Sequence, residues 1–566
     1  MSPTRDGSVT STARDAAPPR RGRCVLALLA ILLPLYGLGL GAAPLFDRDE
    51  AFYIESAREM AGRGNWLTPW FNDQARFDKP ILYYWSQLAS RAALGESEVA
   101  ARVPSALALL VLSLGIFAAV EGIAGTRAAF IAALLVGISG ESLALGRLGI
   151  PDATFALFLT ASWLTAFAWV EGILERRSGA TALAVFLALA VLTKGVVAPV
   201  LLGLALAGQR LWCGPFRRAP DRAAILRVTL VGAAVAAPWF VAETILEGWE
   251  FPKVFFFKHH LERFVSGLPG HDKPWWYFAT NVPFLFLPAI LHLPASWRSA
   301  RRARGGAEAA IAERFARMAL VWFATVLIFF SLSKGKLANY VFPALPAAAI
   351  AAALEIDARW SGRRSLGRSE HVAVGVLGLC AIACLLLSGS IGHAVASLLD
   401  EETRAQFPEL GWVPLAPSFV LATLATLAAR ALGRRDARRF FALAGAAFTT
   451  FALFIALFAM PAFGEQMHGD TRDVARRIGT ALAHQPGRIL QYRFFRPTMV
   501  YYARHPISTT KDRAVLEAEL ANPAPLFIAT LRKHLAREPI PGVTEIGGSS
   551  RFVVLANPAA VATLPP

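Results

Sequence analysis

The sequence is poor in charged residues, which make up only 17% of its 566 positions, whereas 55% are apolar and the mean hydropathy is +0.46. Soluble domains average about 25% charged residues. Apolar stretches recur from Val25 to Met460, and each is long enough to cross a bilayer as a helix. The composition excludes a soluble enzyme, a fibrous protein and a disordered chain. It predicts a polytopic α-helical membrane protein.

Cysteine is also scarce, with four residues in the whole chain. Cys380 and Cys384 stand one helical turn apart in an apolar run, without a His or further Cys at metal-ligand spacing, so neither a disulfide framework nor a zinc knuckle is expected. The net charge of +17 would suggest nucleic acid in a soluble protein. Here the excess is arginine in short loops, so we expect membrane lipids and no nucleic acid as partners.

The arginine-rich loops set a topology. After a basic cytoplasmic tail at residues 1–23, about thirteen spans are predicted near 24–43, 101–120, 128–146, 153–172, 181–193, 196–212, 226–246, 277–297, 316–332, 341–356, 372–392, 413–431 and 440–460. Every second loop is then rich in arginine, as the positive-inside rule requires. The chain has only nine lysines, and this topology puts all of them on or near the outer side. A lysine is a compact point charge suited to a phosphate.

The domain organisation follows from the same pattern. A transmembrane domain at 24–460 includes the outer loop 44–100, which is too long to be a simple connection and holds an amphipathic helical stretch at 50–63. Beyond residue 460 the sequence turns polar. Helical patterns at 471–483 and 512–520 alternate with strand-like runs at 489–494, 526–529 and 552–555, which predicts an α/β domain at 461–566 outside the membrane.

Carboxylates at the outer surface are the candidates for acid-base chemistry. Asp49 and Glu50 follow the first span directly. Acids favour a helix N-terminus, but a positioned carboxylate also serves as a general base. Asp152 begins the fourth span and Lys194 interrupts an apolar run near its outer end. An ionisable group at membrane depth costs about 2.5 to 3.5 kcal/mol and usually marks a cavity or a pair, although Asp152 also fits a helix cap.

Cations and aromatic residues gather on the same side. The segment 77–85 places Asp78 and Lys79 in a proline-fixed turn before Tyr84, and the basic loop 258–273 carries adjacent histidines that diverge on a helix, so a metal is the weaker interpretation. The segment 333–340 joins Lys336 and Tyr340 but lacks the GxxxxGK[ST] form of a nucleotide loop. Such a site suits an anionic ligand that the membrane delivers, for example a polyprenyl phosphate.

A family resemblance enters with these motifs. Asp49-Glu50, Arg58-Glu59-Met60, Gly64-Asn65-Trp66, Phe71-Asn72, Phe77-Asp78-Lys79-Pro80, Tyr84-Trp85, Leu192-Thr193-Lys194-Gly195, Arg263 and Lys334-Gly335-Lys336 to Tyr340 resemble the GT-C glycosyltransferases of family 39 and the aminoarabinose lipid A transferase group. The resemblance runs in order from residue 45 to about 346. It departs at Phe52, where the aminoarabinose group has Arg, and at Asp78, where that group has Glu. The acceptor and any divalent metal therefore stay open.

The resemblance implies transfer of a sugar, with inversion, from a polyprenyl-phosphate donor to a lipid or protein acceptor at the periplasmic face of a bacterial inner membrane. It implies three groups of residues: catalytic Asp49, Glu50 and Asp152; donor-phosphate ligands Lys79, Arg263, Tyr340, Lys336 and Lys194; and the cavity residues Asp78, Tyr53, Tyr84 and His260. A base would take the proton of the acceptor hydroxyl while cations stabilise the departing phosphate.

Two other functions remain open at this point. A lipid-linked sugar translocator or other membrane transporter would also carry ionisable residues at membrane depth, but it should show internal repeats, and the spacing of charged segments shows none. A polytopic scaffold would explain the C-terminal domain but not the converging lysines, arginines and aspartates. Release of free polyprenyl phosphate from a glycosylated donor would discriminate the transferase from both.

Overall fold

The computed structural model describes residues 20–47, 49–262, 272–302, 310–389, 392, 394, 397, 410–483, 485–549 and 551–564. The helices before the C-terminal domain are α1 (Arg21–Gly37), α2 (Asp49–Arg63), α3 (Leu82–Leu94), α4 (Glu98–Ala124), α5 (Thr126–Gly137), α6 (Gly140–Gly146), α7 (Asp152–Val170), α8 (Arg176–Lys194), α9 (Val197–Cys213), α10 (Arg222–Glu247), α11 (Glu250–Pro252), the π-helix η1 (Lys253–Glu262), α13 (Tyr277–Leu285), η2 (Ala289–His292), α14 (Leu293–Arg302), α15 (Ile311–Leu332), η3 (Ala338–Ala344), α16 (Leu345–Trp360), α17 (Arg368–Leu386), α20 (Leu415–Gly433), α21 (Ala437–Phe454) and the π-helix η4 (Ile455–Ala459).

Among the described residues, nine helices are long and apolar enough to cross a membrane, and two sharply bent pairs, α5 with α6 and α13 with η2 and α14, raise this to eleven. The bent pairs coincide with the predicted spans 128–146 and 277–297. The predicted spans 24–43 and 196–212 coincide with α1 and α9, which have 17 residues each. The polytopic helical fold is confirmed, and the number thirteen stays a prediction.

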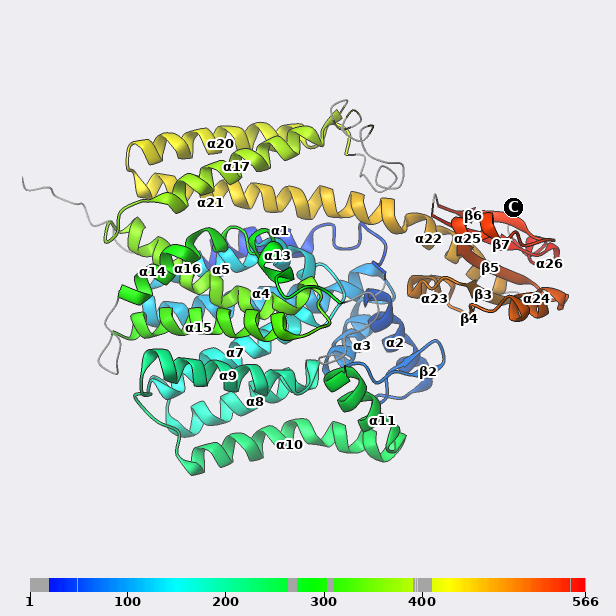
Figure 1. Cartoon of the computed structure of the whole chain (residues 1–566), viewed down its shortest axis with the longest axis horizontal. Coiled ribbons are helices and arrows are strands. Elements are labelled where there is room, and N and C mark those ends of the chain that lie inside the picture. The colour runs from blue at the N-terminus through cyan, green and yellow to red at the C-terminus, as the bar shows by residue number, and fades with distance from the viewer. Residues whose placement is uncertain are drawn as a thin grey trace, which may run out of the picture.

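The long helices run side by side, with α17, α20 and α21 on one flank and α8, α9 and α10 on the other (Figure 1). The helix α16 lies at the centre, and its residues 347–353, six alanines and Ile350, are all buried. Small side chains let neighbouring helices approach closely, which gives packing energy where the lipid supplies no hydrophobic drive. The alanine-rich sequence of α16 therefore accounts for its central place.

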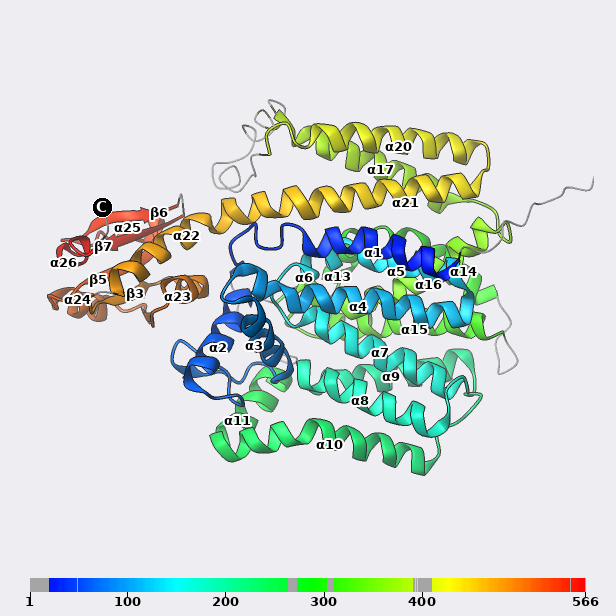
Figure 2. The ribbon, with the colours of Figure 1, turned by 180° about the vertical axis from the view of Figure 1, so that it is seen from behind.

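The two ends of the bundle differ. The helices α2, α3 and α11 lie at the end that carries the C-terminal domain, as both views show (Figure 1 and Figure 2). At the other end the arginine-rich turns contact one another, because Arg127 pairs with Asp357 and Arg314 pairs with Glu171. This separation agrees with the alternation of basic loops that the sequence predicts.

The C-terminal domain holds a five-stranded sheet in the order β4-β3-β5-β7-β6. Its elements are α22 (Met460–Leu482), β3 (Arg488–Tyr492), α23 (Pro497–Ala503), β4 (Ser508–Thr510), α24 (Arg513–Ala521), β5 (Leu526–Leu531), α25 (Arg532–Arg537), β6 (Thr544–Gly548), β7 (Phe552–Ala556) and α26 (Pro558–Val561). The strand β3 is parallel to β4 and β5, whereas β7 is antiparallel to β5 and β6. The predicted α/β domain is confirmed.

The outer loop 44–100 ties this domain to the bundle. A small hairpin, β1 (Trp70–Phe71) with β2 (Gln74–Ala75), follows α2. Asn72 in its turn exchanges two hydrogen bonds with the backbone of Ile507, at 2.7 and 2.9 Å. The backbone N–H of Leu45 donates to the hydroxyl of Tyr502 at 2.8 Å. These bonds fix α2 between the bundle and the domain.

Candidate active site

Glu50 is the centre of a buried network at the start of α2. Its two carboxylate oxygens accept hydrogen bonds from Nε and Nη2 of Arg102, both at 2.9 Å. They also accept from the backbone N–H of Phe46 at 2.7 Å and of Gly149 at 2.6 Å. The Glu50 side chain is 1% exposed. Because it accepts from four donors, the Glu50 carboxylate fastens α2 to α4 and to the turn before α7. This is a structural role, whereas the resemblance implies a catalytic role for Glu50.

Asp49, the residue before it, is exposed at the first turn of α2. One turn later Tyr53 is buried, with its ring against those of Tyr83 and Tyr84 at centroid distances of 5.4 and 5.6 Å. Burial and then the nearby Tyr84 and Asp49 raise the pKa of Tyr53 well above its ordinary value, and Asp152 adds to the same shift. The two expected catalytic aspartates therefore both lie within electrostatic reach of one tyrosine.

Asp152 is 4% exposed at the first position of α7. Its Oδ1 accepts a hydrogen bond from Nζ of Lys194 at 2.7 Å and another from Nδ2 of Asn339 at 2.9 Å. The ammonium of Lys194 also lies 5.4 Å from the ring centroid of Phe155. Asp152 and Lys194, which the sequence marks separately as ionisable residues at a cavity or in a pair, form an ion pair with each other and join α7, α8 and η3 at one point.

Asp78 forms a second charged cluster in the outer loop. Its Oδ1 lies 2.7 Å from Nε2 of His259 in η1, and its Oδ2 pairs with the guanidinium of Arg76. Burial alone would raise the pKa of Asp78, but the His259 hydrogen bond and the charges of Arg76 and Lys79 lower it below its ordinary value. The Arg76 guanidinium stacks 3.9 Å from the ring centroid of Phe52. Asp78 is thus an ionised anchor for two side chains, His259 and Arg76.

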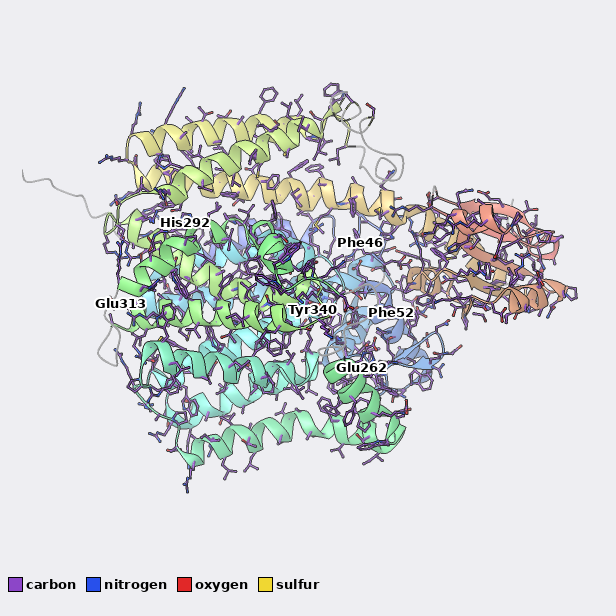
Figure 3. The ribbon with its side chains drawn as sticks, in the orientation of Figure 1. Phe46, Phe52, Glu262, His292, Glu313 and Tyr340 are labelled. Atoms are coloured by element: carbon purple, nitrogen blue, oxygen red, sulfur yellow. The ribbon has the colours of Figure 1, made fainter. Side chains whose placement is uncertain are left out.

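A cavity of about 450 Å³ is lined by side chains from the Asp152 cluster and the Asp78 cluster. Lys79, Lys194, His259 and Tyr340 line its polar part. Its remaining wall is mainly apolar and is formed by Phe155, Val196, Val197, Val200, Phe256, Phe329, Phe330 and Pro343. Figure 3 labels Tyr340 at the end of the bundle that faces the C-terminal domain, the same end as Phe52 and Glu262. With Ser333, five basic or hydroxyl side chains from four separate segments therefore converge on one largely apolar cavity.

The polar part of the cavity carries the two lysines Lys79 and Lys194. Lys194 pairs with Asp152, and Asp78, the residue before Lys79, pairs with Arg76, which is not a lining residue. Val196 and Val200 on the apolar side remain 41% and 43% exposed, so this side opens at the surface of α9. The cavity can accept an anionic head group together with an apolar tail.

Three of the expected residues are placed differently or lie outside the description. Lys336 is buried and donates to the carbonyl oxygens of Lys273, at 3.0 Å, and of Ser333, so its ammonium holds the loop together and is not part of the cavity lining. Arg263 lies outside the described residues, and so does the side chain of His260. Among the described residues, no group of three or more His, Cys, Asp or Glu side chains gathers as a metal site.

Sequence reasoning missed three residues of the site. Arg102 stands in an apolar span, and its position at membrane depth was the signal that it pairs with a carboxylate. His259 lines the cavity, whereas the sequence prediction named its neighbour His260, whose side chain lies outside the described residues. Asn339 stands within the 333–340 motif, but nothing in its spacing indicated Asp152 as its partner.

Comparison with known proteins identifies the family. A model of the dolichyl-phosphate-mannose-protein mannosyltransferase family matches residues 78–241. The undecaprenyl phosphate-α-4-amino-4-deoxy-L-arabinose arabinosyl transferase of Aeromonas hydrophila is 31% identical over 390 residues, which are 67% of this chain and 69% of that protein. The chain belongs to the family of GT-C glycosyltransferases that includes this arabinosyl transferase. The family member from Shewanella sediminis is 30% identical over 63% of this chain, and the match spans 65% of that relative's own length.

The fold of this family member agrees with a solved structure. The crystal structure of ArnT from Cupriavidus metallidurans bound to undecaprenyl phosphate superposes with a TM-score of 0.74 at 22% identity. The match covers 97% of this chain and 100% of that one. The shared architecture therefore includes the C-terminal sheet domain as well as the helical bundle.

Proposed function

We propose that this protein transfers a sugar from a polyprenyl-phosphate donor to a lipid acceptor at the periplasmic face of a bacterial inner membrane, with inversion. The observation that carries the proposal is the cavity of about 450 Å³, which combines Lys79, Lys194, His259 and Tyr340 with an apolar wall. Lysine and tyrosine donors bind phosphate oxygens, and the apolar wall suits an isoprenoid chain. Family membership supports the same donor class, since the relatives are named for undecaprenyl phosphate.

The names of the relatives support an aminoarabinose donor on undecaprenyl phosphate, and a lipid acceptor is our own proposal. Where the aminoarabinose group has Arg, this chain has Phe52, and the guanidinium of Arg76 lies over the Phe52 ring. A positive charge is thus kept at this place from another position in the sequence. A transporter is less well supported, because the relatives are named as transferases.

The geometry supports a division of labour in the reaction. Asp49 is exposed at the head of α2 and acts as the base that takes the proton of the acceptor hydroxyl. The hydroxyl oxygen attacks the anomeric carbon, and the bond from that carbon to the phosphate oxygen breaks. Lys79 and Tyr340 stabilise the negative charge that develops on the departing phosphate. Asp152 keeps Lys194 in place at the cavity wall.

The test uses the full-length protein in liposomes with a glycosylated polyprenyl-phosphate donor and a lipid A acceptor. Free polyprenyl phosphate and glycosylated acceptor should appear in equal amounts. Lys79→Ala should weaken donor use by about tenfold or more, because a lost charge-assisted contact costs about 1.5 to 3 kcal/mol. Lys334→Ala removes an exposed lysine of the outer side that is not part of the cavity lining, and it is the matched control. Donor turnover that Lys79→Ala leaves unchanged would refute the phosphate assignment.

The role of Asp49 needs a single-turnover measurement at saturating donor. Asp49→Asn should transfer roughly 10²- to 10⁴-fold more slowly while it binds the donor normally, because an amide can cap the helix but cannot take the proton. Asp47→Asn is the neighbouring control. Near-normal transfer by Asp49→Asn, with loss in Asp152→Asn, would move the base to Asp152 and leave the transferase function intact.

A further inference from the structure

A second cavity, of about 540 Å³, lies on the other flank of the bundle. It is enclosed by α1, α5, α16, α17 and α21, and it shares no lining residue with the donor cavity described above. Its wall is almost wholly apolar and includes Ile31, Phe130, Leu134, Phe441, Ala444 and Phe448. His292, which also lines it, is labelled below α21, toward the end of the bundle away from the C-terminal domain (Figure 3).

The polar end of this second cavity carries positive charge. Arg127, at the second position of α5, is a lining residue and is 31% exposed. Its Nε donates to Oδ1 of Asp357 at 2.6 Å, and the other oxygen of Asp357 pairs with Arg363. Two guanidinium groups thus share one carboxylate, which leaves a net positive charge at the mouth. Trp360 lines the same end, an aromatic residue of the kind that membrane interfaces favour.

An apolar cavity of this size suits only an apolar occupant. Water needs two to four polar partners, and an apolar wall does not supply them. An empty space would forfeit the packing contacts of every side chain around it. In a bilayer the apolar molecules at hand are lipid chains, and the arginines at the mouth belong to the end where the basic loops gather, which the topology places in the cytoplasm.

We propose that this cavity holds one acyl chain of an anionic glycerophospholipid from the cytoplasmic leaflet, with the lipid phosphate at Arg127. The lipid is a resident component and takes no part in transfer. It fills the space between the flank formed by α17, α20 and α21 and the rest of the bundle. Because α21 continues through η4 into α22, the same lipid supports the helix that carries the C-terminal domain.

Gly445 gives a clean way to close the cavity. It lines the cavity in α21, and a Cβ built on it would meet no atom within 4 Å. Gly445→Leu should therefore occupy the lipid's place without displacing the protein. Gly203 in α9 is the matched control, since it too is a helical glycine with nothing within 4 Å, and it lines neither cavity. Both changes add the same side chain and the same helix propensity.

The experiment purifies the full chain in a mild detergent, washes it extensively, and measures bound lipid by native mass spectrometry. The wild type and Gly203→Leu should each retain about one phospholipid, and Gly445→Leu at least tenfold less. Phosphatidylglycerol added back to protein that a harsher detergent has stripped of its lipid should raise the melting temperature of the wild type but not of Gly445→Leu. Equal phospholipid retention by Gly445→Leu, no phospholipid retained by the wild type, or a polyprenyl lipid that Gly445→Leu loses in place of a phospholipid would each overturn the proposal.

Arg127→Gln tests the mouth separately, and it keeps the proposal testable if the cavity-filling variant does not fold. Its loss of charge should weaken phosphatidylglycerol binding about tenfold, as expected for a charge-assisted contact to phosphate. Binding of phosphatidylcholine, whose head group is neutral overall, should be weaker than that of phosphatidylglycerol in the wild type. Phosphatidylglycerol affinity that Arg127→Gln leaves unchanged would also overturn the proposal.

Discussion

Removal of the Glu50 carboxylate should destabilise the fold around α2 and α4, and loss of transfer activity should follow from this unfolding. Glu50→Ala leaves the Arg102 guanidinium buried, since that side chain is 3% exposed, and it orphans the backbone N–H groups of Phe46 and Gly149. Breaking a buried ion pair by removing one partner costs about 3 to 5 kcal/mol, and each orphaned donor adds about 1 to 3 kcal/mol. The total is comparable with the whole stability of a typical domain, about 5 to 15 kcal/mol.

The measurement is thermal unfolding in detergent together with the yield of monodisperse protein. Glu50→Ala should lose most of its folded yield, whereas Asp49→Asn, one residue away, should unfold at the wild-type temperature. The double change Glu50→Leu with Arg102→Met should recover only part of the loss, because Arg102 also donates to the carbonyl oxygens of Leu40, Ala43 and Pro44. A well-folded Glu50→Ala protein without transfer activity would refute the structural role and return Glu50 to the chemistry.

Three further outcomes are expected. Arg263→Ala should weaken donor use as Lys79→Ala does, measured as the rise in KM for the lipid donor, and an unchanged KM would separate Arg263 from the phosphate. Burial raises the pKa of Glu55 to about 7 despite its ion pair with Arg58, so the folded state binds a proton more tightly than the unfolded state. The free energy of unfolding should therefore fall as pH rises from about 4.5 to 7. Glu55→Gln should make the melting temperature less dependent on pH over this range. An alkaline-phosphatase fusion after Met460 should be active, and an inactive fusion with an N-terminal tag outside would reverse the topology.

Much of the fold is readable from the sequence because the bilayer imposes a simple rule on it. Runs of apolar residues must become helices, since lipid offers the backbone no hydrogen-bond partner. The bent pairs were less readable: α5 and α6 meet at 62° at residues 138–139, and hydropathy alone reads them as one span. In the C-terminal domain the apolar strands β5 and β7 were predicted, whereas β4 at Ser508–Thr510 is a polar edge strand without an apolar signal.

The residues of the site could be predicted from the sequence where they are charged residues in apolar, membrane-spanning sequence, because such residues are rare there. Asp152 and Lys194 stand in apolar sequence, where a charge is expensive, and this cost predicts that each marks a cavity or a pair. That the two pair with each other is known only from the structure. Lys336 and Lys79 look alike in sequence, since each is a lysine in a glycine- or proline-bearing outer turn. Only the folded loop shows that Lys336 faces the backbone carbonyls of its own and a neighbouring segment, while Lys79 faces the cavity. Sequence spacing does not carry that information.

Three acids within four residues illustrate how closely structure and chemistry are joined here. Asp47 accepts a hydrogen bond from the backbone N–H of Thr498 at 3.0 Å, so it holds the C-terminal domain. Glu50 accepts from Arg102 and holds the helical bundle. Asp49 lies between them, at the exposed head of a helix fixed on both sides. Rigid support positions a base better than a free loop does, because catalysis is sensitive to misplacement by about 1 Å. The half-buried Asp47 and the buried Glu50 therefore serve the exposed Asp49 by fixing the position of its carboxylate.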